Sequence, residues 1–301
     1  MKICRVILQE VGSVLAAVGE DEQVRVLRLP LQEGQREVVD VVSWDLLLTS
    51  AGDRPLAAYV AEISEGAEAL GSFADLVAQG RVLTPLDRQE VWAAGVTYWR
   101  SRQARMEESD TASKIYDLVY DAERPELFFK ATPHRVVGPG GEIAVRQDSK
   151  WSVPEPELAV LLDNKLNFIG FTVCNDVSSR DIEGANPLYL PQAKVYDACC
   201  AVGPAVLLVD SLPEKPELRM ECTIKRDGLE VFHGGASTAQ LKRTLPELIG
   251  YLGRSNSFPE GVLLSTGTSI VPPDDFTLQA GDLVEIEIEG VGILANPVKV
   301  V

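Results

Sequence analysis

Two short apolar runs, each adjoining carboxylates, constrain the fold of this chain more than any other feature. The first run, residues 158–162, follows Glu155 and Glu157. The second, Phe168 to Cys174, leads directly into Asp176. Uniformly apolar runs of this length are typical of strands that are buried on both faces. The sequence therefore predicts two core strands with acidic residues at their ends.

These acidic residues are candidates for a metal site. Side chains two positions apart on an extended chain point to the same face, so Glu155 and Glu157 point toward the same region. If the two strands are neighbours, Asp176 lies beside this pair. Three carboxylates without imidazole or thiolate ligands favour Mg²⁺ or Mn²⁺, and without a cation they would repel one another. The alternative is an ordinary solvated strand, since a Glu-x-Glu pair is common without a metal.

The N-terminal third has a mixed pattern. Residues 2–29 alternate apolar and polar on both sides of residues 19–22, which predicts a strand pair joined by an acidic turn. Three short amphipathic helices are expected next, at residues 43–50, 55–65 and 72–79. Strands dominate after residues 83–86. We therefore expect a small α+β domain over residues 1–82 and a larger β-rich domain over residues 83–301.

The second domain is expected to consist mostly of strands. They are predicted at residues 91–98, 126–131, 142–146, 158–162, 168–176, 283–288 and 293–300. Residues 226–228 read Arg-Asp-Gly between two alternating runs and predict a hairpin. Residues 237–254 have the spacing of an amphipathic helix. The charged stretch 99–124 predicts two solvated helices, which we expect to act as a lid over bound substrate.

Composition excludes several classes of function. Lys and Arg number 28 against 45 Asp and Glu, and the net charge of −17 makes nucleic acid and membranes poor partners. Only His134 and His233 are present, far apart in the chain, which excludes a His-rich zinc site. The five cysteines have no C-x-x-C spacing and are expected to be reduced. Glu10 interrupts the N-terminal apolar stretch, so a cytoplasmic protein is expected rather than a secreted one.

Four strings of residues carry a family resemblance. They are PEPELAVLLD at 154–163, NDVSSRD at 175–181, NPLYLPQAKVYD at 186–197 and STGTSIVPP at 265–273. Together they resemble the fumarylacetoacetate hydrolase superfamily, over about two thirds of the chain from Gly95 onward. The resemblance implies an α+β fold with a mixed β-roll core and a small α+β N-terminal domain. It also implies a homo-oligomer, either a dimer or a tetramer.

Two further strings narrow the resemblance to one branch of that superfamily. GVTYWRSRQAR at 95–105 and YDAERPELFFKAT at 120–132 are similar to the 2-keto-3-deoxy-D-arabinonate dehydratases. This similarity implies the following roles: Glu155, Glu157 and Asp176 as metal ligands, Lys194 as the active-site lysine, Glu126 as an acid or base, and Gly267 and Thr268 in a loop that holds the substrate carboxylate.

Two basic residues are further candidates for substrate binding. Lys130 lies on a predicted strand and could reach an anionic substrate, although a paired structural lysine is equally compatible with the sequence. Arg180 follows Asp176 closely and could orient it or bind substrate. A salt bridge from Arg180 to Asp181 or Glu183 would explain it equally well.

A missing histidine favours one type of reaction. Hydrolases of this superfamily usually carry a His after their Gly-x-x-Tyr motif, but the stretch that follows Tyr98 here, residues 99–104, contains no His, so a hydrolytic water has no evident base. The resemblance therefore implies a Mg²⁺-dependent hydro-lyase. It would convert a small anionic 2-keto-3-deoxy sugar acid into a 2,5-dioxo acid through a metal-stabilised enolate, with Glu126 protonating the departing hydroxyl.

Two other functions remain open from the sequence. One is a hydrolase or decarboxylase of a 2,4-diketo acid, which would use the same metal site. The other is a noncatalytic metal-binding or assembly protein, in which the carboxylates only brace the β-roll.

Overall fold

A mixed sheet of twelve strands runs through the computed structural model, which describes residues 1–9, 11–30, 38–99 and 119–301. Its main path has the order β6-β3-β2-β1-β16-β14-β13-β19-β8-β9, while β7 pairs with β1 and β10 with β16. The strands are β1 (Lys2–Leu8), β2 (Gly12–Val18), β3 (Gln23–Val26), β6 (Ala69–Ser72), β7 (Val82–Leu83), β8 (Glu90–Gly95), β9 (Glu126–Ala131), β10 (Val136–Val137), β13 (Pro156–Leu162), β14 (Phe168–Asp176), β16 (Cys200–Leu208) and β19 (Val262–Ser265).

The first strands differ from the prediction. Residues 2–18 form two antiparallel strands rather than one, with Lys2 opposite Val18 and Leu8 opposite Gly12. The polar pair Gln9 and Glu10 interrupts the apolar run at this reversal. Gly12, at φ +90°, is the local signal of the turn. The predicted acidic turn at residues 19–22 is confirmed, because it joins β2 to β3.

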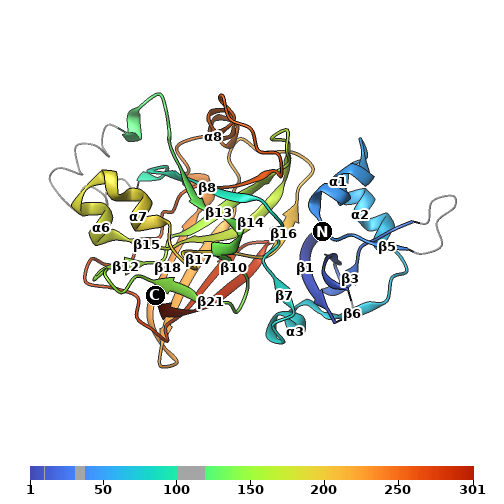
Figure 1. The fold of residues 1–301 in the computed structure, drawn as a ribbon, viewed down its shortest axis with the longest axis horizontal. Helices are drawn as coiled ribbons and strands as arrows, with labels where there is room; N and C mark the ends of the chain where they lie inside the picture. The colour runs from blue at the N-terminus through green and yellow to red at the C-terminus, as the bar shows by residue number, and fades with distance from the viewer. Residues whose placement is uncertain (10, 31–37, 100–118) are drawn as a thin grey trace.

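The three predicted N-terminal helices are confirmed as α1 (Trp44–Ala51), α2 (Leu56–Ser64) and α3 (Phe73–Ala78). The side chains of Ser43 and Ser72 cap α1 and α3 by accepting hydrogen bonds from the backbone N–H groups of Leu46 and Asp75. Figure 1 shows these helices beside β1 and β3, at the blue end of the molecule. A short ladder of β4 (Arg28–Leu29) and β5 (Val39–Asp40) completes this part.

The large sheet crosses the expected domain boundary. β1 pairs with β16 through Lys2 opposite Leu207 and Ile3 opposite Val206, so strands from both parts of the chain share one sheet. The division at residue 82 stays a prediction.

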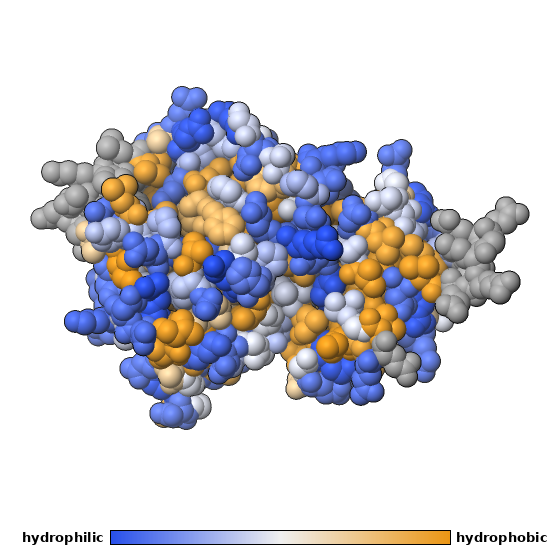
Figure 2. All heavy atoms as spheres, in the orientation of Figure 1, coloured by the Kyte–Doolittle hydropathy of each residue, from blue (hydrophilic) through white to orange (hydrophobic). Residues whose placement is uncertain are grey.

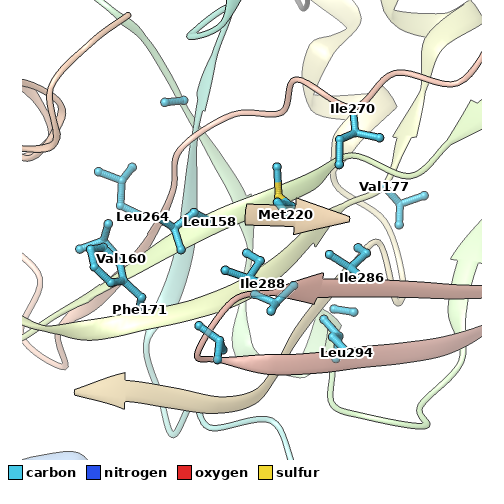
Figure 3. Close-up of a cluster of buried hydrophobic side chains, with 14 of the residues drawn as sticks. Leu158, Val160, Phe171, Val177, Met220, Leu264, Ile270, Ile286, Ile288 and Leu294 are labelled. Carbon is cyan, nitrogen blue, oxygen red and sulfur yellow. The ribbon is translucent and has the colours of Figure 1, made fainter. Parts of the chain in front are cut away.

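A second sheet of five strands covers one face of the large sheet. Its order is β11 (Ile143–Val145), β21 (Gly292–Val300), β20 (Leu283–Ile288), β17 (Arg219–Arg226) and β18 (Leu229–Ser237). Figure 3 shows the core between the sheets, where Leu158 and Val160 of β13 lie near Ile288 of β20. Alternate residues of β13, such as Ala159 and Leu161, belong instead to the core beneath α1 and α2. Both faces of β13 are therefore buried, as its apolar run predicts.

The remaining elements are short. They are β12 (Ser152–Val153), which pairs with β15 (Ser178–Ser179), the helices α6 (Arg180–Ala185), α7 (Leu190–Lys194) and α8 (Leu245–Leu252), and the 3₁₀ turns η1 (Pro133–Arg135), η2 (Pro187–Tyr189) and η3 (Thr238–Gln240).

The prediction of one helix over residues 237–254 was wrong in its first half. Proline is tolerated only in the first turn of a helix, so α8 begins beside Pro246, with Thr244 as its cap.

Part of the charged stretch predicted as a lid, residues 100–118, lies outside the described residues. The segment that follows it is anchored by Arg243, whose guanidinium donates to the carbonyl oxygens of Val119, Ala122 and Glu123. Among the residues that the structure describes, no helix has the length and apolar character needed to cross a membrane.

Candidate functional site

Three carboxylates converge where β13 and β14 lie side by side. The strands are antiparallel, with Glu157 opposite Cys174 and Pro156 opposite Asn175. The backbone N–H of Glu155 donates to Asn175 Oδ1 at 3.1 Å, and the N–H of Asp176 donates to the carbonyl of Glu155 at 3.0 Å. One carboxylate oxygen from each of Glu155, Glu157 and Asp176 lies within 4.8 Å of the other two. The paired strand ends thus bring together the three acidic groups that the sequence singled out.

The environment of these carboxylates suits a hard divalent cation. All three are buried, with 4%, 2% and 1% of Glu155, Glu157 and Asp176 exposed. Burial, followed by the charge of Asp176, raises the pKa of Glu157 well above its usual range. A cation would offset this unfavourable crowding of negative charge. The donor set is oxygen only, as Mg²⁺ and Mn²⁺ prefer, so these residues fit such a metal.

Two cationic side chains contact the same carboxylates. Lys194 is the last residue of α7, and its Nζ lies 2.5 Å from Glu155 Oε2 and 3.0 Å from Asp176 Oδ2. The same Nζ lies 5.6 Å from the ring centroid of Phe128, in β9. Arg180 Nη2 lies 3.4 Å from Glu155 Oε1. Glu155 is therefore held between an ammonium and a guanidinium group.

Glu157 is fixed from the opposite side by the loop after β19. Its Oε2 accepts hydrogen bonds from Ser265 Oγ at 2.5 Å and from the Gly267 N–H at 2.8 Å. Gly267 has φ +93°, and a Cβ there would lie 2.0 Å from Thr97 Oγ1 and 2.9 Å from the carbonyl oxygen of Ala94. Only glycine tolerates both this positive φ and the lack of space for a Cβ atom. The loop and the end of β8 are therefore packed directly against each other.

A cavity opens over these groups. The lining residues are Ala94, Gly95, Val96, Glu126, Phe128, Glu155, Glu157, Asp176, Arg180, Glu183, Lys194, Gly267 and Thr268. Glu126 enters it from the first position of β9, directly opposite Gly95 in β8. A Cβ on Gly95 would lie 2.0 Å from Glu126 Oε2, so the glycine leaves the space that this carboxylate occupies. Val96 has φ +53°, a strained value for a β-branched residue, and it lines the same wall.

Most of the predicted site residues therefore surround one cavity. Lys130 does not line it: the side chain is fully buried behind Asp176, with its Nζ 2.7 Å from Asp176 Oδ1. Asp181, considered above as a partner of Arg180, accepts hydrogen bonds from Ser149 Oγ and the Lys150 N–H. The roles assigned to these residues stay predictions.

Three residues of the site were not assigned roles from the sequence. Glu183 is buried, lines the cavity and accepts a hydrogen bond from Ser178 Oγ at 2.9 Å. It follows Arg180 by three positions, which places the two on one face of α6, and that spacing is the signal that could have indicated it. Phe128 shares a strand face with Glu126. Ser265 adjoins the glycine loop, but nothing in its local sequence indicates its bond to Glu157.

Comparison with known proteins places this geometry in context. The family model described as "Fumarylacetoacetate (FAA) hydrolase C-terminal" matches residues 96–299. A protein of Haloferax volcanii named "Probable 2-keto-3-deoxyxylonate dehydratase" is 48% identical over 268 residues, which cover 87% of this chain and 92% of that protein. The "2-dehydro-3-deoxy-D-arabinonate dehydratase" of Saccharolobus solfataricus is 47% identical over 222 residues, covering 73% of this chain and 74% of that protein.

A solved structure is similar over the full chain. It is described as "2-keto-3-deoxy-D-arabinonate dehydratase complexed with magnesium and 2,5-dioxopentanoate", and it matches with a TM-score of 0.80 and 36% sequence identity. The match covers 100% of this chain and 99% of that one. It confirms the sheet-rich fold that the sequence resemblance implied.

Proposed function

Because the chain belongs to the fumarylacetoacetate hydrolase family and gathers three buried carboxylates at one cavity, we propose that it is a magnesium-dependent dehydratase of a 2-keto-3-deoxy sugar acid. The substrate is a small anionic 2-keto acid, and the product is a 2,5-dioxo acid formed by loss of one water molecule. The cluster of Glu155, Glu157 and Asp176 carries this proposal, since it lies in a chain 47% and 48% identical to relatives named as such dehydratases.

The names of the two relatives are compatible with a single substrate. In the D series, arabinonate and xylonate differ only at C2 and C3, and both stereocentres are lost when C2 becomes a ketone and C3 a methylene. The two 2-keto-3-deoxy acids are then the same five-carbon compound. We infer that this compound, 2-keto-3-deoxy-D-arabinonate, is the substrate.

The acidic cluster is proposed to hold the metal. Glu155, Glu157 and Asp176 supply the ligand oxygens, and a divalent cation bound there would stabilise the negative charge that develops on the substrate's C2 oxygen as C3 loses a proton. Ser265 and Gly267 keep Glu157 in place, as Lys194 and Arg180 do for Glu155. A set of ligands fixed before substrate arrives loses little freedom on binding.

The other cavity residues handle protons and charge. Dehydration transfers the C3 proton to a base and breaks the C4–O bond, so the departing hydroxyl needs a proton to leave as water. Tautomerisation of the resulting 3-ene, which still carries the C5 hydroxyl, then gives the C5 aldehyde. Glu126 is half-buried on the cavity wall, and we assign it as the donor of that proton. Lys194 supplies positive charge beside the reacting oxygens. Thr268 and Arg180 line the same cavity, where they can contact the substrate carboxylate.

The cavity wall does not favour hydrolysis. Within the described part of the chain, no histidine lines the cavity, and the sequence directly after Tyr98, residues 99–104, contains none. A general base for water is therefore not supplied in the manner usual for the hydrolases of this family.

Product analysis tests the proposal. The protein is incubated with Mg²⁺ and 2-keto-3-deoxy-D-arabinonate, and the aldehyde product is followed by mass spectrometry. We expect one five-carbon 2,5-dioxo acid and loss of activity on thorough chelation. Two smaller fragments would instead identify a carbon–carbon lyase or hydrolase.

A paired substitution tests the metal ligands. Glu155→Gln should abolish both Mg²⁺ binding and turnover, whereas Glu65→Gln, on the exposed end of α2, should change neither. Unchanged Mg²⁺ affinity in Glu155→Gln would remove this residue from the metal site. The carboxylates would have a noncatalytic role if the wild-type protein shows no turnover and Glu155→Gln only lowers its stability.

A further inference from the structure

Lys130 occupies an irregular position in β9. In the pairing with β8, Trp92 lies opposite Phe129 and Val91 opposite Ala131, so Lys130 has no opposite residue in β8. This is a β-bulge, a feature that re-aims a side chain and is frequent next to active sites. The side chain it re-aims here is completely buried. A fully buried lysine is rare unless it is paired, so its contacts indicate its task.

The Lys130 ammonium contacts three oxygens. Nζ donates to the carbonyl oxygen of Val177 at 2.9 Å and to that of Lys194 at 2.6 Å, and it lies 2.7 Å from Asp176 Oδ1. Two of its three N–H groups donate to these carbonyl oxygens, and its charge is paired with that of Asp176. Lys130 also does not line the cavity. These contacts argue against the direct substrate contact that the sequence suggested.

Two parts of the active site meet at this one nitrogen. Asp176 lies between two lysines, with Oδ1 near Lys130 Nζ and Oδ2 near Lys194 Nζ at 3.0 Å. The main chain of Lys194 is in turn held by Lys130. We propose that Lys130 is a positioning residue, which fixes the carboxylate of Asp176 and the backbone of Lys194 in the arrangement that metal and substrate require. The kinetic part of this proposal rests on the proposed function, whereas the part concerning the metal does not.

The buried charges around the cavity indicate the role of Lys130 in the metal-free protein. Among the described residues around the cavity, four buried carboxylates and three buried cations are present: Glu155, Glu157, Asp176 and Glu183, and Lys130, Lys194 and Arg180. Without Lys130, two cations would face the same four carboxylates. Leaving a buried charge without its partner is strongly destabilising. Lys130 thus keeps the acidic cluster assembled in the metal-free protein, and a bound divalent cation takes over part of that task.

The Lys130→Met variant tests this role, because methionine keeps the length of the side chain but not its charge. Its unfolding temperature is measured with chelator and with saturating Mg²⁺, and its kcat and KM are measured at saturating Mg²⁺. Without metal we expect a fall on the order of 10 °C, and with Mg²⁺ a clearly smaller one. Because Lys194 loses its anchor, kcat should fall by about 10²-fold even with metal present. Lys165→Met, at an exposed position between β13 and β14, is the matched control and should change none of these values.

Other outcomes would overturn the proposal. A purely structural lysine would give the same fall in unfolding temperature with and without Mg²⁺ and an unchanged kcat. A substrate-binding lysine would raise KM at unchanged kcat and unchanged response to Mg²⁺. Lys130→Gln, which retains N–H donors without the charge, is the second variant if the first does not fold, and failure of both to fold with saturating Mg²⁺ would show that Lys130 serves folding instead. The thermal shift requires no substrate, so a failure of the proposed reaction alone would leave the Mg²⁺ result intact.

Discussion

Glu126 and the three clustered carboxylates share one functional group but have different surroundings. Glu155, Glu157 and Asp176 are buried beside cations and N–H or O–H donors, which hold their oxygens within reach of one metal ion. Glu126 enters the cavity from another strand, in the space left by Gly95, and is half-buried. This difference in position is the reason for which we propose metal binding for the cluster and proton transfer for Glu126.

The first prediction concerns Glu126. General acid catalysis typically contributes about 10² to 10⁴ in rate, so Glu126→Gln should slow turnover by a factor in that range. The Mg²⁺ affinity should stay nearly unchanged, because Glu126 is not a proposed ligand. Rates are measured through the aldehyde product and affinity by calorimetry. Glu123→Gln, an exposed glutamate three positions earlier, serves as control, and an equal rate in both variants would remove Glu126 from the mechanism.

Buried thiols make stability depend on alkaline pH. Burial raises the pKa of Cys222, in β17, from 9.0 to about 12. Between these two values the unfolded chain has lost the thiol proton while the folded chain retains it. The folded state then binds more protons, so stability falls as pH rises through this window and is fully present below pH 9.

The second prediction follows from this difference. At pH 10.5 the Cys222 thiol should lower stability by about 2 kcal/mol relative to pH 8, at about 1.4 kcal/mol per pKa unit. Cys222→Ala lacks this titration, so its urea-unfolding midpoint should decline less over the same interval. Urea unfolding of both proteins at the two pH values gives the comparison. Equal declines would show that Cys222 titrates normally.

Elements bounded by local signals could be predicted from the sequence. Ser43 and Ser72 indicate where α1 and α3 begin, because their side chains cap these helices. The apolar run of β14 ends at Asp176, and the strand ends there too. The reversal between Leu8 and Gly12 was missed although Gln9, Glu10 and Gly12 mark it in the sequence, and the start of α8 was misplaced because the constraint of Pro246 was not applied.

The site could be predicted only where its residues lie close together in the sequence. The spacing of Glu155 and Glu157 places them together, and proximity to Asp176 follows if the two strands are neighbours, as they are. The bond from Ser265 to Glu157 joins residues 108 positions apart, and it exists because β19 pairs with β13. No local pattern encodes such a pairing. The roles of Lys194 and Glu126 were likewise suggested by family resemblance rather than by spacing.

The third prediction belongs to the loop after β19. Gly267→Ala places a Cβ against Thr97 and Ala94 at a positive φ, so the loop must shift and its N–H moves away from Glu157. Such strain costs on the order of 1–3 kcal/mol. We expect lower stability together with weaker Mg²⁺ binding, measured by thermal unfolding and calorimetry.

Gly228→Ala is the matched control for Gly267→Ala. Gly228 also has a positive φ, at +79°, but a Cβ there meets nothing within 4 Å. It should cost about 1 kcal/mol in stability and leave Mg²⁺ affinity unchanged. If the two variants bind Mg²⁺ equally well, the loop does not position the metal site.

At the scale of the whole molecule, the surface suggests association. Figure 2 shows apolar groups over the N-terminal part on the face in view. Exposed apolar side chains also occur near the cavity, where Leu188 is 83% exposed and Tyr189 43%. Together with the edge strands β9 and β18, such surface is commonly covered by a partner subunit.

The fourth prediction is therefore a homo-oligomer. Light scattering at micromolar protein should return two or four times the subunit mass of 32.7 kDa. Dilution toward nanomolar concentration checks whether activity depends on assembly. A mass of one subunit at micromolar concentration would contradict this prediction.

The large sheet joins the metal site to the rest of the chain. The proposed ligands Glu157 and Asp176 lie in β13 and β14, and β16 connects β14 to β1 of the N-terminal part. The helices α1 and α2 pack on the same sheet, so Trp44 and Leu47 share a core with Leu161. Unfolding the N-terminal part alone would expose this shared core, whereas a ligand bound at β13 and β14 stabilises the state in which all these strands are paired.

The last prediction is that Mg²⁺ stabilises the whole chain through one transition. Binding of a ligand at one hundred times its dissociation constant adds about 2.7 kcal/mol to the free energy of unfolding. Calorimetry should therefore show a single peak that moves to higher temperature with increasing Mg²⁺, and no such shift in Glu155→Gln. Two peaks, of which Mg²⁺ moves only one, would show that residues 1–82 unfold independently and that the pairing of β1 with β16 does not couple the two parts.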